Sequence, residues 1–536
     1  MFGDFAHLSS GDTIDADLCI IGAGAAGISI AHSFVGQRTR VCLVESGGFD
    51  FEAETQDLYA GTSIGLPVAL DSGRLRMFGG TTNHWGGRCV PFSPAELAKR
   101  SWVPYSGWPI SSETLQPYYD RARSICGFTQ PRLERDDMFR LLNLDTTLAA
   151  TGDVEPLFLP FAPHEGAIYW NFGTSYRDEL EKAENIRVLL HGNLVGFDTD
   201  ATARHVERIR LRDLAGKSAS VSARYFVLCT GGIENARLLL LPGDHAPSGI
   251  GNSRDLVGRF FMQHPRVVKA ATIAASERFS PLQDFYNDFI GPDGVQYAVG
   301  VTLSDQAQRR AQILSCSATF EYEGDPEAGS TAAQDIWRKL RDGRWADDLG
   351  TKVWRVIRDL PGFASSAERW VRSGRHPLLP LMTTSVTVEL EQLPDPDSRV
   401  TLGAERDALG LPRVETDWRI SDLERETARQ FMVALGAYLG ARGLGRLRVE
   451  PALEQPGDAW AEAVNETYHY LGTTRMAADP SQGVVDIDCR VHGMDNLFVA
   501  GSSVFPTGGY ANPTLTITAL ALRLADRFRD IFAQTL

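Results

Sequence analysis

The stretch ADLCIIGAGAAGISIAHSFVGQRTRVCLVE, residues 16–45, contains the pattern that decides the fold. Its apolar segments at 16–21 and 41–45 predict two β-strands, and the segment 28–36 predicts a helix between them. The turn before the helix contains only small residues, which are Gly22, Ala23, Gly24, Ala25, Ala26 and Gly27. Such a turn lets the backbone approach a pyrophosphate, whose negative charge the helix N-terminus stabilises. We therefore predict a Rossmann-like βαβ unit that binds a dinucleotide.

An acidic residue at the end of the second predicted strand supports this prediction. Glu45 follows the glycine turn by about 20 residues, the spacing at which a carboxylate hydrogen-bonds the ribose hydroxyls of a bound dinucleotide. The combination of strand, turn, helix, strand and carboxylate favours a nucleotide site over an ordinary turn followed by a helix. It does not distinguish NAD from FAD, so that choice depends on the rest of the chain.

A second glycine-rich segment, FGGTTNHWGG at 78–87, follows Arg74 and Arg76. Flexible backbone of this kind can pass close to a flat ring or a phosphate. The alternative is a mobile surface loop. His84 and Trp85 argue against that alternative, because an aromatic pair is unusual in a loop that only meets solvent.

The composition of the chain excludes several classes of protein. With 536 residues the chain exceeds one typical domain of about 100 to 200 residues, so we expect two domains. The formal charge of −15 argues against a nucleic-acid partner, because phosphate binding needs a concentrated basic surface. The seven cysteines show neither a C-x-x-C pair nor a metal-ligand spacing, which predicts a reducing compartment and no metal site. No apolar run approaches a membrane span of about 18 to 20 residues, and Asp15 and Asp17 precede the first one, so we expect a cytoplasmic protein.

Three further motifs contain residues suited to a cofactor and a reaction. They are YFVLCTGG at 225–232, YHYLGTTRM at 468–476 and GSSVFPTGGYANPTLT at 501–516, the last running into an amphipathic helix. The candidate residues within them are Gly231, His469, Gly501, Asn512, Pro513 and Thr514. Together with the βαβ pattern, these motifs resemble the glucose-methanol-choline (GMC) oxidoreductases. The similar stretches cover the first 90 residues, roughly 220–265 and the last 75 residues, in the order found in that family.

The resemblance implies FAD as cofactor and an α/β fold, with a Rossmann-like FAD-binding domain and an α+β substrate-binding domain built on a largely antiparallel sheet. It places residues 1–90, 171–270 and 465–536 in the first domain, and residues 91–170 and 271–464 in the second. The expected FAD contacts are Gly22, Gly24, Ala25, Ala26, Gly27, Glu45, Gly79, Gly80, Thr82, Asn83, His84, Gly231, Gly501, Pro513 and Thr514. The motifs are most similar to those of pyranose oxidases and the large subunits of flavin sugar dehydrogenases, where the histidine before the tryptophan is linked covalently to the flavin. His84 is therefore the predicted tether.

The resemblance also assigns the catalytic pair. His469 matches the catalytic histidine, and Asn512 matches the partner position that holds His or Asn. Removing hydride from an alcohol requires that the hydroxyl proton leave as well, and a neutral imidazole, titrating near ~6.5, can accept it. His469 could instead be an ordinary buried histidine, and Asn512 a helix N-cap followed by proline at N1. Two other histidines, His264 and His492, are expected to be structural.

One insert differs from the rest of this acidic chain. Residues 335–375 contain ten Lys and Arg against six Asp and Glu, together with four tryptophans. Val353, Trp354, Ile357 and Leu360 fall on one face of a predicted helix. Such a helix can lie on a membrane surface or contact a partner that accepts electrons. The alternative is a face packed against its own domain.

The predicted function is oxidation of an alcohol, a secondary hydroxyl of a sugar, glycoside or polyol, with hydride transfer to flavin N5 and His469 as base. The alternatives are an oxidase or dehydrogenase of primary or aromatic alcohols, an FAD-containing lyase of the same family, and a flavoprotein that only binds a ligand. The sequence does not identify the substrate. It also leaves open whether oxygen, a quinone or a protein accepts the electrons, and the oligomeric state.

Overall fold

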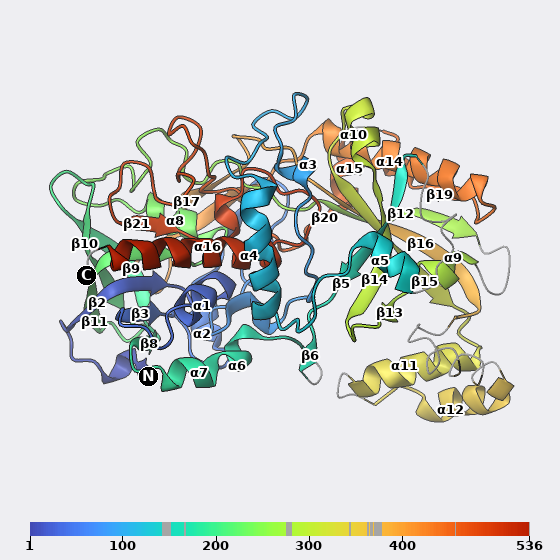
Figure 1. The fold of residues 1–536 in the computed structure, drawn as a ribbon, viewed down its shortest axis with the longest axis horizontal. Helices are drawn as coiled ribbons and strands as arrows, with labels where there is room; N and C mark the ends of the chain where they lie inside the picture. Colours follow the sequence, from blue (N-terminus) through green and yellow to red (C-terminus); the bar gives the residue numbers. More distant parts are fainter. Residues whose placement is uncertain are drawn as a thin grey trace.

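The computed structural model describes residues 1–141, 152–165, 168–274, 281–341, 345–361, 378–455 and 457–534, together with residues 364 and 368. Two large sheets organise the chain, and Figure 1 shows them at opposite ends of the molecule. One carries the nucleotide-binding pattern, and the other forms the core of the second part. The predicted fold class is confirmed by this arrangement.

The predicted βαβ unit lies at the centre of the first sheet. It consists of β2 (Thr13–Ile21), α1 (Ala25–His32) and β3 (Val41–Val44), and the two strands pair in parallel. The strand order of this sheet is β1-β8-β3-β2-β11-β10-β9, with β21 beside β11. The remaining strands are β1 (Phe2–Asp4), β8 (Ile186–Leu190), β9 (Asn193–Thr199), β10 (Val206–Arg212), β11 (Ser218–Leu228) and β21 (Leu497–Val499). Because β2 and β11 run in parallel at the centre, their carboxyl ends meet at one edge of the sheet.

Helices cover this sheet. The C-terminal helix α16 (Thr514–Ala533) packs against α1, and α4 (Ser112–Ile125) packs against α16, as Figure 1 shows. The short helix α8 (Glu234–Leu240) follows β11, and it is buried along most of its length. The first residues of α1 and α16, Ala25 and Thr514, line the same cavity as Ile21 at the end of β2 and Cys229 just after β11.

The second sheet is antiparallel, as predicted. Its strand order is β13-β14-β15-β16-β12-β19, with β5 beside β14 and β20 beside β12. The strands are β5 (Val154–Pro160), β12 (Arg266–Ala274), β13 (Phe289–Ile290), β14 (Gln296–Leu303), β15 (Cys316–Gly324), β16 (Leu381–Leu390), β19 (Leu447–Val449) and β20 (Val464–Asn465). One face packs against α14 (Asp422–Ala441), and the apolar residues that alternate along β15 and β16 are buried there.

Two segments of the predicted substrate-binding domain contact the nucleotide-binding part. Helix α4, which we assigned to the second domain within 91–170, packs against α16 of the nucleotide-binding part. A small sheet joins β17 (Arg399–Arg406) and β18 (Pro412–Asp417) to β4 (Gly61–Ser63), and β17 also contacts α8. The two parts therefore share more contacts than a division of the chain into separate residue ranges suggests.

The basic insert forms a helical hairpin below the second sheet in Figure 1. Helix α11 (Gly329–Arg341) packs against α12 (Leu349–Arg358), and no residue of α12 is buried. The exposed apolar side chains of the hairpin are Trp337, Leu340, Trp345, Val353, Trp354, Ile357 and Leu360. The alternative in which this face packs on its own domain is therefore wrong for these residues. The insert's remaining residues at 342–344, 362–363, 365–367 and 369–375 lie outside the described part of the chain.

None of the helices in the described ranges has both the length and the apolar character needed to cross a membrane.

Candidate active site

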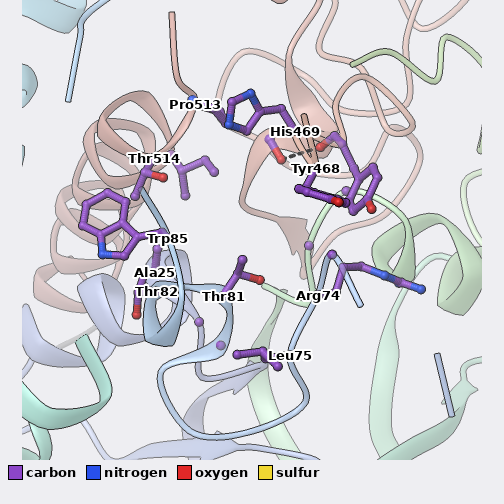
Figure 2. A pocket seen from close by; sticks show the side chains of 18 of the residues that line it. Ala25, Arg74, Leu75, Thr81, Thr82, Trp85, Tyr468, His469, Pro513 and Thr514 are labelled. Atoms are coloured by element: carbon purple, nitrogen blue, oxygen red, sulfur yellow. Dashed lines mark hydrogen bonds between the residues drawn. The ribbon is translucent and has the colours of Figure 1, made fainter. Parts of the chain in front are cut away.

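A cavity of about 830 Å³ lies where the two parts of the molecule meet. Its lining comes from the glycine turn after β2, the loop at 78–87, the segment around His469, the start of α16 and one face of the second sheet. Figure 2 shows His469, Trp85 and Thr514 around the same space, with Thr81 and Thr82 on the loop side. The cavity is therefore shared by the predicted nucleotide site and the predicted catalytic residues.

The glycine turn has the geometry that a dinucleotide requires. Gly22 has φ +101°, and a Cβ atom at Gly27 would lie 1.9 Å from the Gly22 carbonyl oxygen, so a larger residue would push α1 away from the turn. Gly24 precedes the first turn of α1 and has no side chain to cap it. The backbone N–H groups of that first turn are consequently free to bind a phosphate at the helix N-terminus. These observations fit the pyrophosphate of FAD.

Glu45 lines the cavity, but its carboxylate also supports the turn. Oε2 accepts a hydrogen bond from the Ala23 backbone N–H at 2.8 Å, and Oε1 accepts one from the Gly47 N–H at 3.0 Å. Each carboxylate oxygen can accept more than one hydrogen bond. The residue can therefore hold the turn in place and still contact a ribose.

The loop at 78–87 folds over the cavity, so the alternative of a loop that only meets solvent is wrong. Gly79 adopts φ +95°, and its N–H donates to the Ala23 carbonyl at 2.8 Å, which ties the loop to the glycine turn. Asn83 donates through Nδ2 to the carbonyls of Phe78 and Gly80. His84 lines the cavity, and burial lowers the pKa of its imidazole.

Most of the predicted contact residues line the cavity, and three do not. Those that do are Gly22, Gly24, Ala25, Ala26, Glu45, Gly80, Thr82, His84, Gly231, His469, Gly501, Asn512, Pro513 and Thr514. Gly27, Gly79 and Asn83 lie behind the lining and shape the turn and the loop through packing and hydrogen bonds.

His469 and Asn512 come together, as the catalytic pair requires. Asn512 Nδ2 lies 3.4 Å from His469 Nε2. No side chain caps α16, so the role of Asn512 as a helix N-cap is not borne out, although Pro513 does adopt helical backbone angles at the helix start. The amide of Asn512 faces the histidine and the cavity instead.

The contact with His264 determines which ring nitrogen of His469 carries the proton. The carbonyl of Gly508, 3.2 Å from His264 Nε2, can only accept, so that nitrogen carries a proton and donates. Burial lowers the pKa of His264, which keeps the ring neutral and leaves its Nδ1 unprotonated. His469 Nδ1, 2.8 Å away, therefore donates to His264 Nδ1, and His469 Nε2 is left as the basic atom. His264 therefore has more than the structural role expected from its place in the sequence, because it accepts the hydrogen bond that fixes the proton of His469.

His469 is neutral at physiological pH. Its burial, followed by the nearby His264, lowers the pKa of the imidazole to about 3, and the carboxylate of Glu389 opposes this effect. A buried, neutral histidine with an unprotonated nitrogen facing a cavity can accept a proton from a bound hydroxyl group. The other histidine, His492, donates from Nε2 to the Ala477 carbonyl at 3.0 Å and does not line the cavity, and its structural role stays a prediction.

A charged group that no sequence motif reveals lies on the wall formed by the second sheet. Glu389 of β16 accepts hydrogen bonds from Arg266 of β12 at 2.5 and 3.1 Å, and Arg88 lies 3.7 Å from the same carboxylate oxygen. Burial opposes ionisation of Glu389, but the two guanidinium groups outweigh it and lower the pKa to about 2. The carboxylate is therefore charged and lines the cavity that His469 faces.

Comparison with known proteins agrees with this site. A model of the GMC oxidoreductase family matches residues 394–521. The chain is 34% identical to a C-glycoside 3-oxidase of Microbacterium trichothecenolyticum, over 91% of this chain and 79% of the relative. It is 25% identical to the large subunit of a fructose dehydrogenase of Gluconobacter japonicus, over 96% and 98% of the two chains.

Solved structures show the same fold at lower identity. A formate oxidase of Aspergillus oryzae, in which FAD modification was studied, superposes with a TM-score of 0.55 at 16% identity, covering 99% of this chain and 100% of that one.

Proposed function

The chain belongs to the GMC oxidoreductases, FAD-dependent enzymes that act on CH–OH donors, and we propose that it oxidises a secondary hydroxyl of a sugar, glycoside or polyol to a carbonyl. The observation that carries the proposal is the unprotonated Nε2 of His469 in the cavity, with Asn512 Nδ2 beside it at 3.4 Å. Two relatives support a sugar-like substrate by their own activities, a fructose dehydrogenase and a C-glycoside 3-oxidase.

In the proposed reaction, His469 Nε2 takes the hydroxyl proton of the substrate, and the Asn512 amide donates a hydrogen bond to the same oxygen. When bound, FAD supplies the hydride acceptor, its N5 atom. Proton removal by a positioned base typically contributes ~10²- to 10⁴-fold to the rate, because it prevents positive charge from building up at the carbon.

The residues proposed to hold FAD lie on three elements. The first turn of α1 would hold the pyrophosphate, Glu45 would bind the ribose, and the free N–H groups in the first turn of α16 would face the flavin pyrimidine. A helix N-terminus favours negative charge, so α16 would stabilise the reduced, anionic form of the cofactor.

We predict that His84 is linked covalently to the flavin. The residue lines the cavity, and burial lowers the pKa of its imidazole, which leaves a nitrogen lone pair for bond formation. The new C–N bond would replace a C–H bond of the flavin, with the proton released and the two electrons passing through the flavin ring to the electron acceptor of the reaction. Acid precipitation of the purified protein should leave the yellow colour in the pellet, whereas His84→Ala should release it. Complete release from the wild-type protein would contradict the prediction.

Anaerobic bleaching of the flavin absorbance tests the proposed function directly. We expect sugars, glycosides or polyols to bleach it, and His469→Ala to slow bleaching by ~10²- to 10⁴-fold without loss of flavin. Bleaching by benzyl-type alcohols alone would select the primary or aromatic alcohol alternative. Cleavage of a cyanohydrin with the flavin still oxidised would select the lyase. If nothing on a broad panel reduces a flavin that dithionite can reduce, the sugar assignment is lost.

The exposed hairpin of α11 and α12 is proposed as a docking surface for an anionic lipid bilayer. Exposed tryptophan and aliphatic side chains on a basic hairpin suit the boundary between lipid headgroups and acyl chains. Lys and Arg outnumber Asp and Glu in this insert, although the whole chain has a formal charge of −15, and this local positive charge would attract an anionic surface. The cytoplasmic location inferred from the cysteine usage stays a prediction.

A further inference from the structure

The second sheet presents a polar face to the cavity. In an antiparallel pair, residues opposite one another share a face, and every second residue along a strand returns to it. Arg266 lies opposite Glu389, and Thr319 lies opposite Thr387. Two residues further along β15, Glu321 lies on the same face, and all five side chains line the cavity.

Several hydrogen-bonding groups of this wall are unused. Both hydrogen bonds of Arg266 go to Glu389 Oε1, and within the described ranges no hydrogen bond reaches Oε2. The Arg88 guanidinium contacts Glu389 only at 3.7 Å, beyond hydrogen-bond distance. Glu321 Oε1 accepts one bond, from Thr387 Oγ1 at 2.8 Å.

Hydrogen-bonding groups that the protein leaves unused in a cavity are available to a ligand, and hydrogen bonds to charged groups are stronger than those between neutral groups. Two guanidinium groups and two carboxylates give the wall no net charge. A neutral ligand that offers both donors and acceptors is therefore favoured over a charged one. Adjacent hydroxyl groups have this property, since each can donate to a carboxylate and accept from an arginine.

We propose that Arg88, Glu321 and Glu389 form a recognition site for the hydroxyl groups that neighbour the oxidised carbon. The substrate class is thus a polyhydroxylated ring, and a simple secondary alcohol lacks the groups that this site binds. The inference rests on the proposed function and adds the residues that select the substrate. Arg88 and Glu321 would bind the neighbouring hydroxyl groups, whereas His469 accepts the proton of the hydroxyl group that is oxidised.

The test is a thermodynamic cycle that combines removal of a hydroxyl group from the substrate with substitution of a residue in the enzyme. It uses the pyranose that bleaches the wild-type flavin fastest, its monodeoxy analogues, and the variants Arg88→Gln, Glu321→Gln and Glu389→Gln. A hydrogen bond to a charged group is worth roughly 1.5 to 3 kcal/mol, so removing one hydroxyl should lower kcat/KM of the wild type by about 10- to 100-fold. In the variant that has lost its partner, the same deoxy analogue should show no further penalty.

A matched control is available on the same strand. Glu323 lies two residues beyond Glu321 on β15, is exposed, and does not line the cavity. Glu323→Gln should keep every deoxy penalty of the wild type. Glu321 is itself exposed to the cavity, so its variant is expected to fold even if Glu389→Gln, which breaks an ion pair, does not.

Two outcomes would count against these ideas separately. If no sugar bleaches the wild-type flavin, the proposed function fails. If sugars do bleach it but every deoxy penalty persists in Arg88→Gln and Glu321→Gln, only the recognition site is overturned.

Discussion

The hydrogen bond between His264 and His469 links a backbone carbonyl to the chemistry of the site. Gly508 fixes the proton on His264 Nε2, and His264 in turn fixes the proton on His469 Nδ1. Without this chain, the neutral ring of His469 could carry its proton on either nitrogen, and only one of the two forms is a base toward the cavity.

We therefore expect different results from two substitutions of His264. Asn can place an amide oxygen where Nδ1 now accepts, so His264→Asn should keep most of the activity. His264→Leu should slow flavin reduction by up to about 100-fold, the lower end of a general-base contribution. The pH profile separates this from simple misfolding.

In the wild type, His469 is an active base above its lowered pKa, so the rate should stay level from neutral pH down to mildly acidic pH and fall only near pH 3. Loss of the His264 contact should change the position of that acid limb as well as the plateau. A lower plateau with an unchanged limb in His264→Leu would indicate a structural role only.

Among single residues, those that lie within a contiguous motif could be predicted from the sequence. Those that strand pairing brings together could not. His469 and Asn512 lie in contiguous, unusual segments, whereas Arg266 and Glu389 are more than a hundred residues apart. The alternation of polar and apolar residues along 385–389 is a signal from which a two-sided strand could have been predicted. Only strand pairing could tell that its polar side faces the cavity.

Among the elements, β1, β8 and the chain before α2 (Ala53–Asp57) are held together by one imidazole. His191 has Asp4 Oδ2 at 2.7 Å from Nδ1 and Glu52 Oε1 at 2.8 Å from Nε2. Burial disfavours the cation, but the two carboxylates outweigh it and raise the pKa of His191. Both ring nitrogens can donate only when the ring is protonated.

This cluster predicts a pH dependence of stability. A raised pKa in the folded state contributes stability that is complete below the unfolded value near ~6.5 and is lost as pH rises through the folded value. The difference in urea midpoint between the wild type and His191→Gln should therefore be largest in mildly acidic buffer and shrink in alkaline buffer. His205→Gln, at an exposed position, provides the control. A constant difference at all pH values would contradict the role of charge.

The order of elements was largely predictable, and the boundaries between the two parts were not. Local patterns give β2, α1, β3 and α16, because each has its own periodicity and turn chemistry. The assignment of α4 and β17 depends on which surface they cover, α16 and α8 respectively, and a linear pattern contains no information about that partner.

For the whole molecule, the hairpin of α11 and α12 predicts binding to lipid. The purified holoenzyme should sediment with vesicles that contain anionic lipid and much less with neutral ones, and added salt should weaken the binding. Trp354→Asp together with Ile357→Asp should abolish it without affecting flavin reduction, because both side chains are exposed.

Val433→Asp replaces an exposed apolar residue elsewhere on the surface and is the matched control. If the wild type sediments with neither anionic nor neutral vesicles, the lipid proposal is wrong. A particle mass that increases with protein concentration and returns to the monomer value in the double variant would assign the hairpin to contacts between copies.

Along β15 and β16, residues that pack in the core alternate with residues that line the cavity. Ala318, Phe320, Val386 and Val388 are buried in the core, while Thr319, Glu321, Thr387 and Glu389, which alternate with them, line the cavity. Residues that secure folding and residues that select a ligand are thus interleaved in the sequence but lie on opposite sides of the sheet. A combinatorial library confined to the outward positions Thr319, Glu321 and Thr387 could change which molecules the enzyme accepts while the hydrophobic interior stays intact.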